Sequence, residues 1–374
     1  MMNYELVRAL AFAAPAVCAF ICMILILFDA FNPDKNRQER SLRLFLVLTC
    51  TVAMFCWTGL VLQVINPRAF VYYHTVFFFT LMMDQVLIYR FVHIITDTEP
   101  HKPFGRRHFL APFFLTAIAA IIALYVPYEQ QNAVIYGTGE RQGGDSGLFA
   151  VFYPSTQIIF IIYNTLYPLL GFLRIQRYRH IIKNYSADTQ RTSLNWLSVL
   201  LTLVLVTIPV PLAGMLWGLD VFNNFWTSIQ GVLPTFIIYL ILCYNLISDN
   251  YVIISPDDEE DDPDKDMQID VKLFSKYIHE KKPYLNPKLK ITDLCKGFGT
   301  NRSYMSAFIN KEYGMNFSRF INRCRLEELD RQRTSSTGKE RSAMELVLMA
   351  GFSSYQSYLR VKNEEYKESI LKVN

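Results

Sequence analysis

The chain has 374 residues, of which 52% are hydrophobic, and its 37 Lys and Arg slightly outnumber its 33 Asp and Glu. This length predicts two or three domains, and the apolar excess, nearly all of it before Ser255, is more than soluble domains usually carry. The seven cysteines are scattered without a paired metal spacing, which argues against a disulfide framework or a zinc site.

Residues 1–250 contain seven apolar segments long enough to cross a bilayer of about 30 Å. One such segment could be a buried core helix, but seven in succession, separated by short charged loops, predict a transmembrane bundle. The expected spans are Val7–Phe28, Leu42–Ile65, Phe70–Val92, Phe109–Val126, Leu148–Leu173, Leu194–Leu219 and Phe222–Ile247.

The charges of the loops predict the orientation of this bundle. The loops after the first, third and fifth spans hold twelve Lys and Arg, including Arg43, against three on the opposite side. Because cytoplasmic loops are enriched in basic residues, the N-terminus is expected outside and the C-terminus inside. We therefore expect a multi-pass protein of the bacterial inner (cytoplasmic) membrane, in contact with the lipid bilayer, whose C-terminal domain is cytoplasmic.

Asp84 is the one acid deep within an expected span. Charges in hydrocarbon are costly and tend to face a bundle interior or a cavity. Its candidate polar neighbours are Gln85, Gln157, Asn164 and Gln230. Two interpretations remain open, a ligand or ion site within the bundle and a structural hydrogen bond between helices.

Two polar segments connect these elements. Pro127–Gly147, the longest external loop, contains the glycine-rich GTGERQGGDSG and is expected to be a plain connector. Residues 251–270 include Pro256–Asp270, which has nine acids and one lysine and cannot collapse into a core. An extended acidic linker is therefore expected before residues 271–374, whose formal charge of +9 suits contact with phosphate.

Ile291–Glu312 has the spacing of two short helices joined by a tight turn. Gly299 ends the first, because glycine tolerates the left-handed conformation of a helix stop, and Asn301 can cap the second. The alternative is an ordinary helical hairpin. The spacing favours a helix-turn-helix, whose second helix can enter the major groove of DNA.

A long amphipathic helix over Ser318–Asp330 follows a stop at Gly314, and a second unit spans Ala343–Leu359 with its own stop at Gly351. Two helix-turn-helix units bridged by one helix resemble the DNA-binding domain of AraC-type (arabinose-regulator) transcription factors. The resemblance covers about Leu273 to Tyr366, through NRSYMSAFINKEYGMNFSRFINRCRLEEL and AGFSSYQSYL. It implies that two reading helices enter successive major-groove segments on one face of double-stranded DNA.

The candidate DNA contacts follow from the position of each residue along these units. In the first unit they are Asn301, Arg302, Ser303, Ser306 and Asn310, and in the second they are Ser353, Ser354, Tyr355, Gln356 and Arg360. Arg302 is the principal candidate for base contact, because its guanidinium can hold guanine in a bidentate pair. Phosphate contacts are expected from Lys311, Arg319 and Arg323, and Arg325 is expected to serve phosphate or a salt bridge.

The sequence thus predicts an all-α chain with a seven-helix transmembrane bundle, followed by a cytoplasmic helical domain with two helix-turn-helix units over residues 271–374. The function expected is that of a membrane-bound one-component transcription regulator, whose bundle senses a small-molecule or envelope signal; a homodimer is left open. The alternative is a membrane receptor or transporter-like protein whose tail is a protein-interaction module. The sequence shows no HExxH pattern, kinase catalytic loop or nucleotide fingerprint, so no enzyme, cofactor or metal site is expected.

Overall fold

A computed structural model describes residues 2–98, 104–137, 147–217, 225–253, 269–334 and 341–373. The regular structure of these residues is helical, apart from one isolated bridge between Ser186 and Lys290. Most of the glycine-rich loop and most of the acidic linker lie outside the described residues. The chain forms two compact units. The first comprises Met1–Thr96, Lys102–Ile175 and Asn195–Asp249, and the second comprises Asp97–His101, Gln176–Leu194 and Asn250–Asn374.

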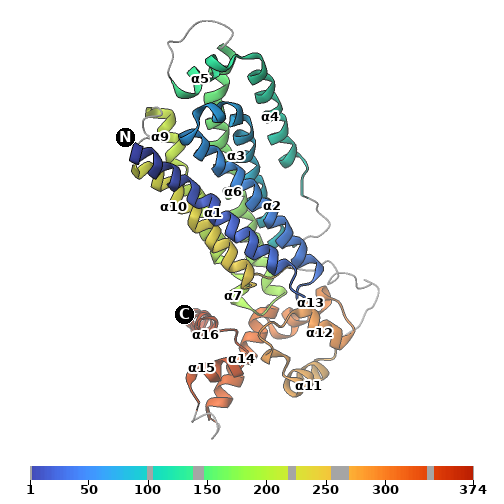
Figure 1. The fold of residues 1–374 in the computed structure, drawn as a ribbon. Helices are drawn as coiled ribbons and strands as arrows, with labels where there is room; N and C mark the ends of the chain where they lie inside the picture. The colour runs from blue at the N-terminus through green and yellow to red at the C-terminus, as the bar shows by residue number, and fades with distance from the viewer. Residues whose placement is uncertain are drawn as a thin grey trace. The chain divides into compact units, whose positions relative to one another are not determined.

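The first unit is a bundle of long apolar helices (Figure 1). They are α1 (Met2–Ala30), α2 (Arg37–Ile65), α3 (Pro67–Ile95), α4 (Arg107–Tyr125), α5 (Tyr128–Tyr136), most of α6 (Gly147–Ile181), α8 (Asn195–Val206), α9 (Pro209–Trp217) and α10 (Phe225–Ile247). Among the described residues, seven helical stretches are long and apolar enough to cross a membrane, which confirms the number of spans predicted. Large apolar side chains such as Phe28 and Leu124 stay exposed on the bundle, as suits helices that face lipid.

Charged side chains join three of these helices where α1 ends and α2 begins. The Arg43 guanidinium is fully buried and donates to Asp29 Oδ2 at 2.5 Å and to Asp249 Oδ1 at 2.8 Å. Lys35 also pairs with Asp249, which follows α10. Arg43 was expected among the loop cations, but it lies within α2 and pairs with Asp29 and Asp249.

The bundle departs from the sequence prediction in the external loop. The short helix α5 occupies part of the expected plain connector, beginning after Pro127 and ending at Gly137 in the left-handed conformation. Gln131 donates from Nε2 to the carbonyls of Ala123 and Val126, both at 2.8 Å. Because these carbonyls lie at the end of α4, α5 caps that helix and the loop is more ordered than its composition suggests.

The sixth expected span is interrupted rather than continuous. It is divided into α8 and α9 at Thr207 and Ile208, just before Pro209. Pro209 and Pro211 lack amide hydrogens, so the backbone hydrogen bonds of a continuous helix cannot form there. The Thr207 hydroxyl instead donates to the Val204 carbonyl at 2.7 Å.

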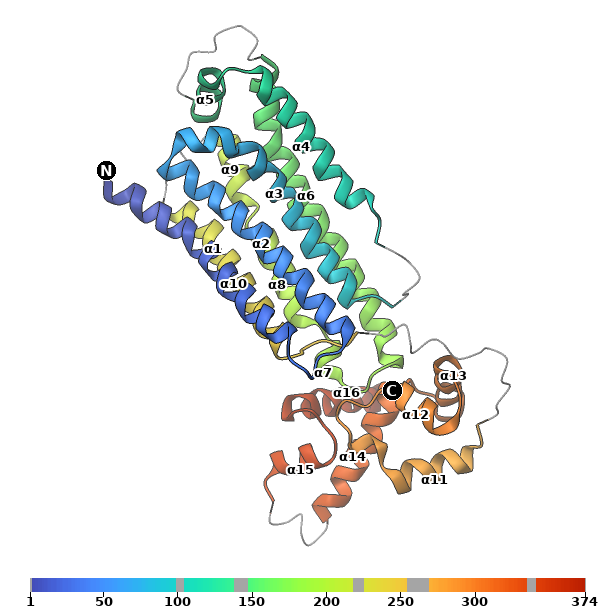
Figure 2. The ribbon, with the colours of Figure 1, turned by 45° about the vertical axis from the view of Figure 1, so that its right-hand side comes forward.

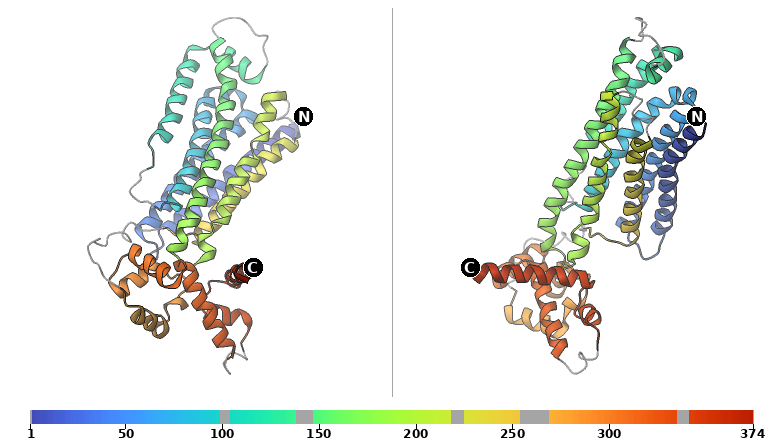
Figure 3. Two further views of the ribbon diagram at one scale, coloured as in Figure 1. Left: turned by 180° about the vertical axis from the view of Figure 1, so that it is seen from behind. Right: turned by 90° about the vertical axis from the view of Figure 1, so that its left-hand side faces the viewer.

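The second unit contains α11 (Val271–Lys281), α12 (Ile291–Phe298), α13 (Arg302–Tyr313), α14 (Phe317–Thr334), α15 (Ala343–Met349) and α16 (Tyr355–Val373). In Figure 2, α14 runs between α11–α13 and α15, and Figure 3 shows α16 as one straight helix. The ring of Phe274 packs against Phe298, Phe308 and Phe320 to form one core. A second core joins α14, α15 and α16 through Leu329, Val347 and Phe352, among others.

The predicted ends of the helices in this unit are confirmed. Gly299 and Gly314 end α12 and α13 with φ angles of 60° and 66°, and the Asn301 side chain accepts from the amide of Tyr304 at 2.9 Å. Gly351 has a φ of 94°, and a Cβ added there would clash with the Tyr284 carbonyl oxygen and the Leu285 backbone. This close approach packs the α15–α16 turn against residues 283–285.

Substitution of Gly351 tests this packing. Gly351→Ala should lower the free energy of unfolding by about 2–4 kcal/mol, because the new Cβ meets backbone atoms that cannot move aside cheaply. Gly314→Ala is the matched control, since it also has a positive φ but no atom within 4 Å of its added Cβ, and it should cost about 1 kcal/mol. Urea-gradient proteolysis of the full-length protein measures both, and equal losses would contradict the packing described.

Candidate functional site

Helix α13 presents two opposed faces. Met305 and Ile309 are fully buried, whereas Ser303, Asn310 and Lys311 are exposed. Arg302 follows the Asn301 cap directly, and its side chain is half-buried in the first turn of the helix, as is Ser306 one turn later. The five residues proposed for the first unit therefore lie on α13 or its cap, and none belongs to the core.

The residues proposed for DNA contact in the second helix pair differ in their surroundings. Two of them hydrogen-bond within the protein. Ser354 accepts from the amide of Ser357 at 3.1 Å at the start of α16, and Ser353 donates to Asp188 Oδ1 at 3.4 Å. Tyr355 and Gln356 are exposed in the first turn of α16, and Arg360 is half-buried one turn further on. The available reading surface of this helix is thus carried by Tyr355 and Gln356.

The candidate phosphate contacts differ in whether they already pair with a carboxylate. Arg319 Nε donates to Glu365 Oε1 at 2.8 Å, which links α14 to α16, and Arg323 pairs with Glu327 on the same helix at 3.3 Å. Lys311 is exposed near the end of α13. The Arg323–Glu327 pair is exposed, and exposed ion pairs contribute about 0–1 kcal/mol, so a phosphate could replace Glu327 at little cost. The Arg319–Glu365 pair is half-buried and joined by two hydrogen bonds.

Arg325 does not have the role expected from the sequence. Its side chain is 1% exposed, so it cannot reach phosphate. The guanidinium donates to the carbonyls of Tyr284 at 2.8 Å, Asn286 at 2.8 Å and Ala187 at 3.2 Å. A further bond goes to Asn322 Oδ1 at 3.0 Å. Burial lowers the pKa of Arg325 to about 10, opposed by the nearby Asp188 carboxylate, so the group stays charged at neutral pH.

The carbonyl of Ala187 belongs to a segment that the sequence analysis assigns to the transmembrane domain. We call Tyr185–Asp188 the junction segment. It bonds to α12 through the Ile291 amide and the Tyr185 carbonyl at 2.9 Å. It also bonds to α14 through Asn322 and Arg325, and to the α15–α16 turn through Ser353. All four of its residues are buried, so both helix pairs and α14 depend on one short stretch of chain.

Substitution of Arg325 measures this dependence. Arg325→Met should lower the free energy of unfolding of the second unit by about 3 kcal/mol, because the buried Tyr284 carbonyl loses its donor and the Ala187 and Asn286 carbonyls each lose one of two. Arg323→Met, two residues away on the exposed face of α14, should cost less than about 0.5 kcal/mol. Pulse proteolysis of the full-length protein in urea gives both values. Similar small losses would show that the buried network is not what holds the unit together.

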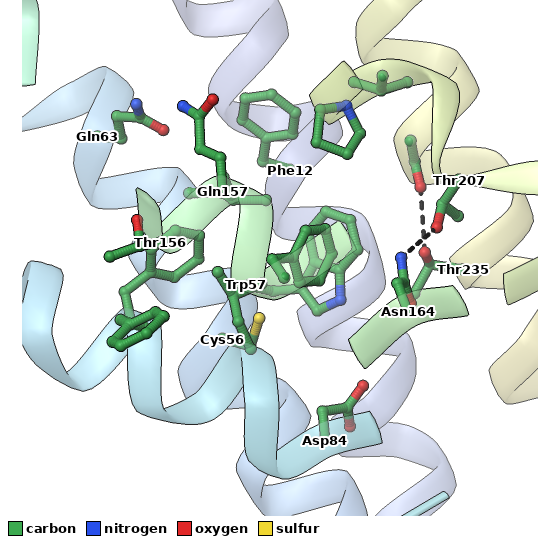
Figure 4. A pocket seen from close by; sticks show the side chains of 18 of the residues that line it. Phe12, Cys56, Trp57, Gln63, Asp84, Thr156, Gln157, Asn164, Thr207 and Thr235 are labelled. Atoms are coloured by element: carbon green, nitrogen blue, oxygen red, sulfur yellow. Dashed lines mark hydrogen bonds between the residues drawn. The ribbon is translucent and has the colours of Figure 1, made fainter. Parts of the chain in front are cut away.

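The first unit encloses a second candidate site, a cavity of about 560 Å³ between its helices (Figure 4). Asp84, Gln85 and Asn164 all line it, so the structure brings together the three residues proposed from the sequence. Gln157 lines it as well. Gln230 is exposed and does not line the cavity, so it is not a neighbour of Asp84 there.

The polar atoms of this cavity are incompletely paired. Asn164 Nδ2 donates to the Thr207 hydroxyl at 3.1 Å, at the break between α8 and α9, but Asn164 Oδ1 is buried without a donor. Asp84 Oδ1 is likewise buried without a hydrogen-bond partner among the described residues. No hydrogen bond between helices is therefore found among these residues for this oxygen of Asp84. No group of three or more His, Cys, Asp or Glu in the described part of the chain could hold a metal ion.

Comparison with known proteins gives no further guide to either site. No protein-family model, no curated protein and no solved structure matches the chain.

Proposed function

We propose that this protein is a membrane-bound one-component transcription regulator, whose C-terminal unit binds double-stranded DNA in a sequence-specific manner. The observation that carries this proposal is the exposed polar face of α13, with Ser303 and Asn310, beside the half-buried Arg302 of the first turn, on a helix whose other face is anchored in the core. Residues 271–374 carry a formal charge of +9, which suits a surface that approaches a polyanion.

In this proposal α13 lies in the major groove with its N-terminal turn toward the base edges. The Arg302 guanidinium offers a fixed pair of donors that match guanine O6 and N7, and Asn310 can bond to adenine. Helix α16 reads a second groove segment through Tyr355 and Gln356. Lys311, Arg319 and Arg323 would hold the phosphates that flank these contacts.

The membrane part has the role of sensor in this proposal. The seven candidate spans make a multi-pass membrane protein, and the loop charges favour an inner-membrane orientation with the N-terminus outside and the DNA-binding unit in the cytoplasm. The cavity around Asp84 is where a small molecule could act on the bundle. A homodimer would place two such units on one DNA site.

One observation favours the alternative function, a receptor or transporter-like protein with an interaction module as its tail. Met344, Leu348 and Met349 on α15 expose 57%, 44% and 46% of their surfaces, and exposed apolar side chains of this kind suit a protein partner. The two functions differ in salt dependence, because DNA binding weakens steeply with added salt whereas apolar docking does not.

Reporter fusions test the proposed orientation. Alkaline phosphatase, which is active only outside the cytoplasm, should be inactive when fused after Asn250 and active when inserted after Gly143. The reason is the excess of Lys and Arg in the loops after the first, third and fifth spans. Activity after Asn250 would place the C-terminal unit outside and rule out DNA binding there.

Arg302 gives the sharpest test of the proposed base contact. The full-length protein in nanodiscs is used to select sites from random duplexes, and affinity is then measured for the best site and its single-base variants at several salt concentrations. Arg302→Ala should cost roughly 1–3 kcal/mol and remove the preference at one base position. Arg319→Ala should weaken all sequences alike and reduce the salt slope by about one.

Lys276→Ala is the control, because Lys276 is an exposed cation on α11, outside the proposed reading surface, and pairs with Glu280. It should change affinity far less than either variant. If Arg302→Ala loses affinity equally for every base variant, Arg302 is a phosphate contact and the reading face is wrongly assigned. If the wild-type protein selects no DNA even at low salt, the interaction module becomes the better proposal.

A further inference from the structure

We propose that the cavity of the first unit binds a small organic ammonium compound, whose cationic head pairs with Asp84. In the proposed function, this compound would be the signal that the regulator senses. Only that role rests on the proposed function. Binding itself requires the cavity alone.

The first feature that points to a ligand is a shortage of hydrogen-bond donors for two acceptors of the cavity. Asp84 Oδ1 and Asn164 Oδ1 are two buried acceptors without donors. Three threonine hydroxyls on the cavity wall already donate to backbone carbonyls. Thr156 donates to the Tyr153 carbonyl at 2.6 Å, and Thr207 and Thr235 donate to carbonyls of their own segments at 2.7 and 3.0 Å. A bound molecule that carries donors would therefore satisfy the two acceptors.

The second feature is the charge of Asp84, which no basic side chain on the described walls of the cavity pairs with. A carboxylate in the middle of an apolar helix is costly unless a cation compensates it. The basic side chains among the described lining residues are Arg8 and His74. Arg8 stacks over Phe12, which lies at the other end of the cavity from Asp84 in Figure 4, and His74 Nδ1 bonds to the Val71 carbonyl at 2.6 Å. Neither bonds to Asp84, so the compensating cation in this proposal is the ammonium group of the ligand.

The walls around Asp84 select the kind of cation. The thiol of Cys56 and the ring of Trp57 line the cavity together with Asp84 (Figure 4). A bare metal ion such as Na⁺ or Mg²⁺ needs several oxygen ligands, which these groups do not supply. Aromatic rings instead attract organic cations through their faces, and Phe12, Trp57 and Tyr239 all line the cavity.

The size of the cavity fits a small molecule of this class. A volume of about 560 Å³ lies within the range of ligand sites. Asn164 belongs to α6 and Asp84 to α3, and both line the cavity. A ligand with an ammonium group at one end and a hydroxyl at the other could therefore supply both missing donors, with an aromatic or aliphatic body between them.

The test uses tyramine as the probe and the full-length protein in nanodiscs, without DNA. Tyramine is compared with its neutral counterpart tyrosol, in which a hydroxyl replaces the amine, by equilibrium binding. Tyramine should bind saturably and at least about tenfold more tightly than tyrosol. Asp84→Asn should weaken tyramine binding at least about tenfold with little effect on tyrosol, and Asp84→Glu should restore part of it. The control is Asp34→Asn, the same change in an exposed loop, which should bind as the wild type does.

Four results would overturn the proposal. They are no saturable tyramine binding up to about 10 mM, equal affinity for tyrosol, unchanged tyramine binding by Asp84→Asn, and thermal stabilisation by Na⁺ but not by tyramine. The comparison of tyramine with tyrosol decides the matter if Asp84→Asn does not fold. A protein that binds tyramine but no DNA would refute only the transcriptional function, and one that binds DNA but fails this assay would refute only the ligand class.

Discussion

The buried guanidinium of Arg325 is the interaction on which the rest of the second unit depends. It occupies a point where α14, residues 284–286 and the junction segment meet, and each of its four bonds ends on a different residue. A buried carbonyl without a donor costs about 1–3 kcal/mol, so these contacts form or fail together. The spacing between α13 and α16 therefore rests on the same network that anchors the junction segment.

This arrangement gives the membrane bundle a covalent route to the proposed reading helices. Helix α6 supplies Asn164 to the cavity of the first unit and Tyr178 to the second, where the Tyr178 hydroxyl donates to the Val252 carbonyl at 2.8 Å. The junction segment follows α6 within a few residues.

Local signals in the sequence were sufficient for much of the fold. The stops at Gly299 and Gly314 and the cap at Asn301 depend on single residues with a defined backbone preference, and the seven spans depend on composition over about 20 residues. The interruption of the sixth span could also have been predicted, since Pro209 and Pro211 stand in its middle. Asp84 was identified because an acid in an apolar run is rare.

The remaining features depend on contacts between residues far apart in the chain. Nothing in the junction segment, which reads YSAD, indicates that it packs against Ile291, Asn322 and Ser353 more than one hundred residues later. The role of Arg325 could not be predicted for the same reason. Other arginines on α14, such as Arg323, are exposed, and the sequence does not show which arginine is buried. The walls of the cavity come from α1–α6 and α8–α10, so candidate residues could be named from the sequence but no volume could.

The central claim is that this membrane protein binds specific DNA sites through its C-terminal unit. The most direct test is genome-wide mapping of DNA crosslinked in cells to the tagged full-length protein, recovered from the membrane fraction, beside the Arg302→Ala variant. The account predicts a small number of discrete sites with a common sequence motif, lost or altered at one motif position in the variant. Recovery of no enriched DNA, or of the same sites at the same strength with Arg302→Ala, would contradict it.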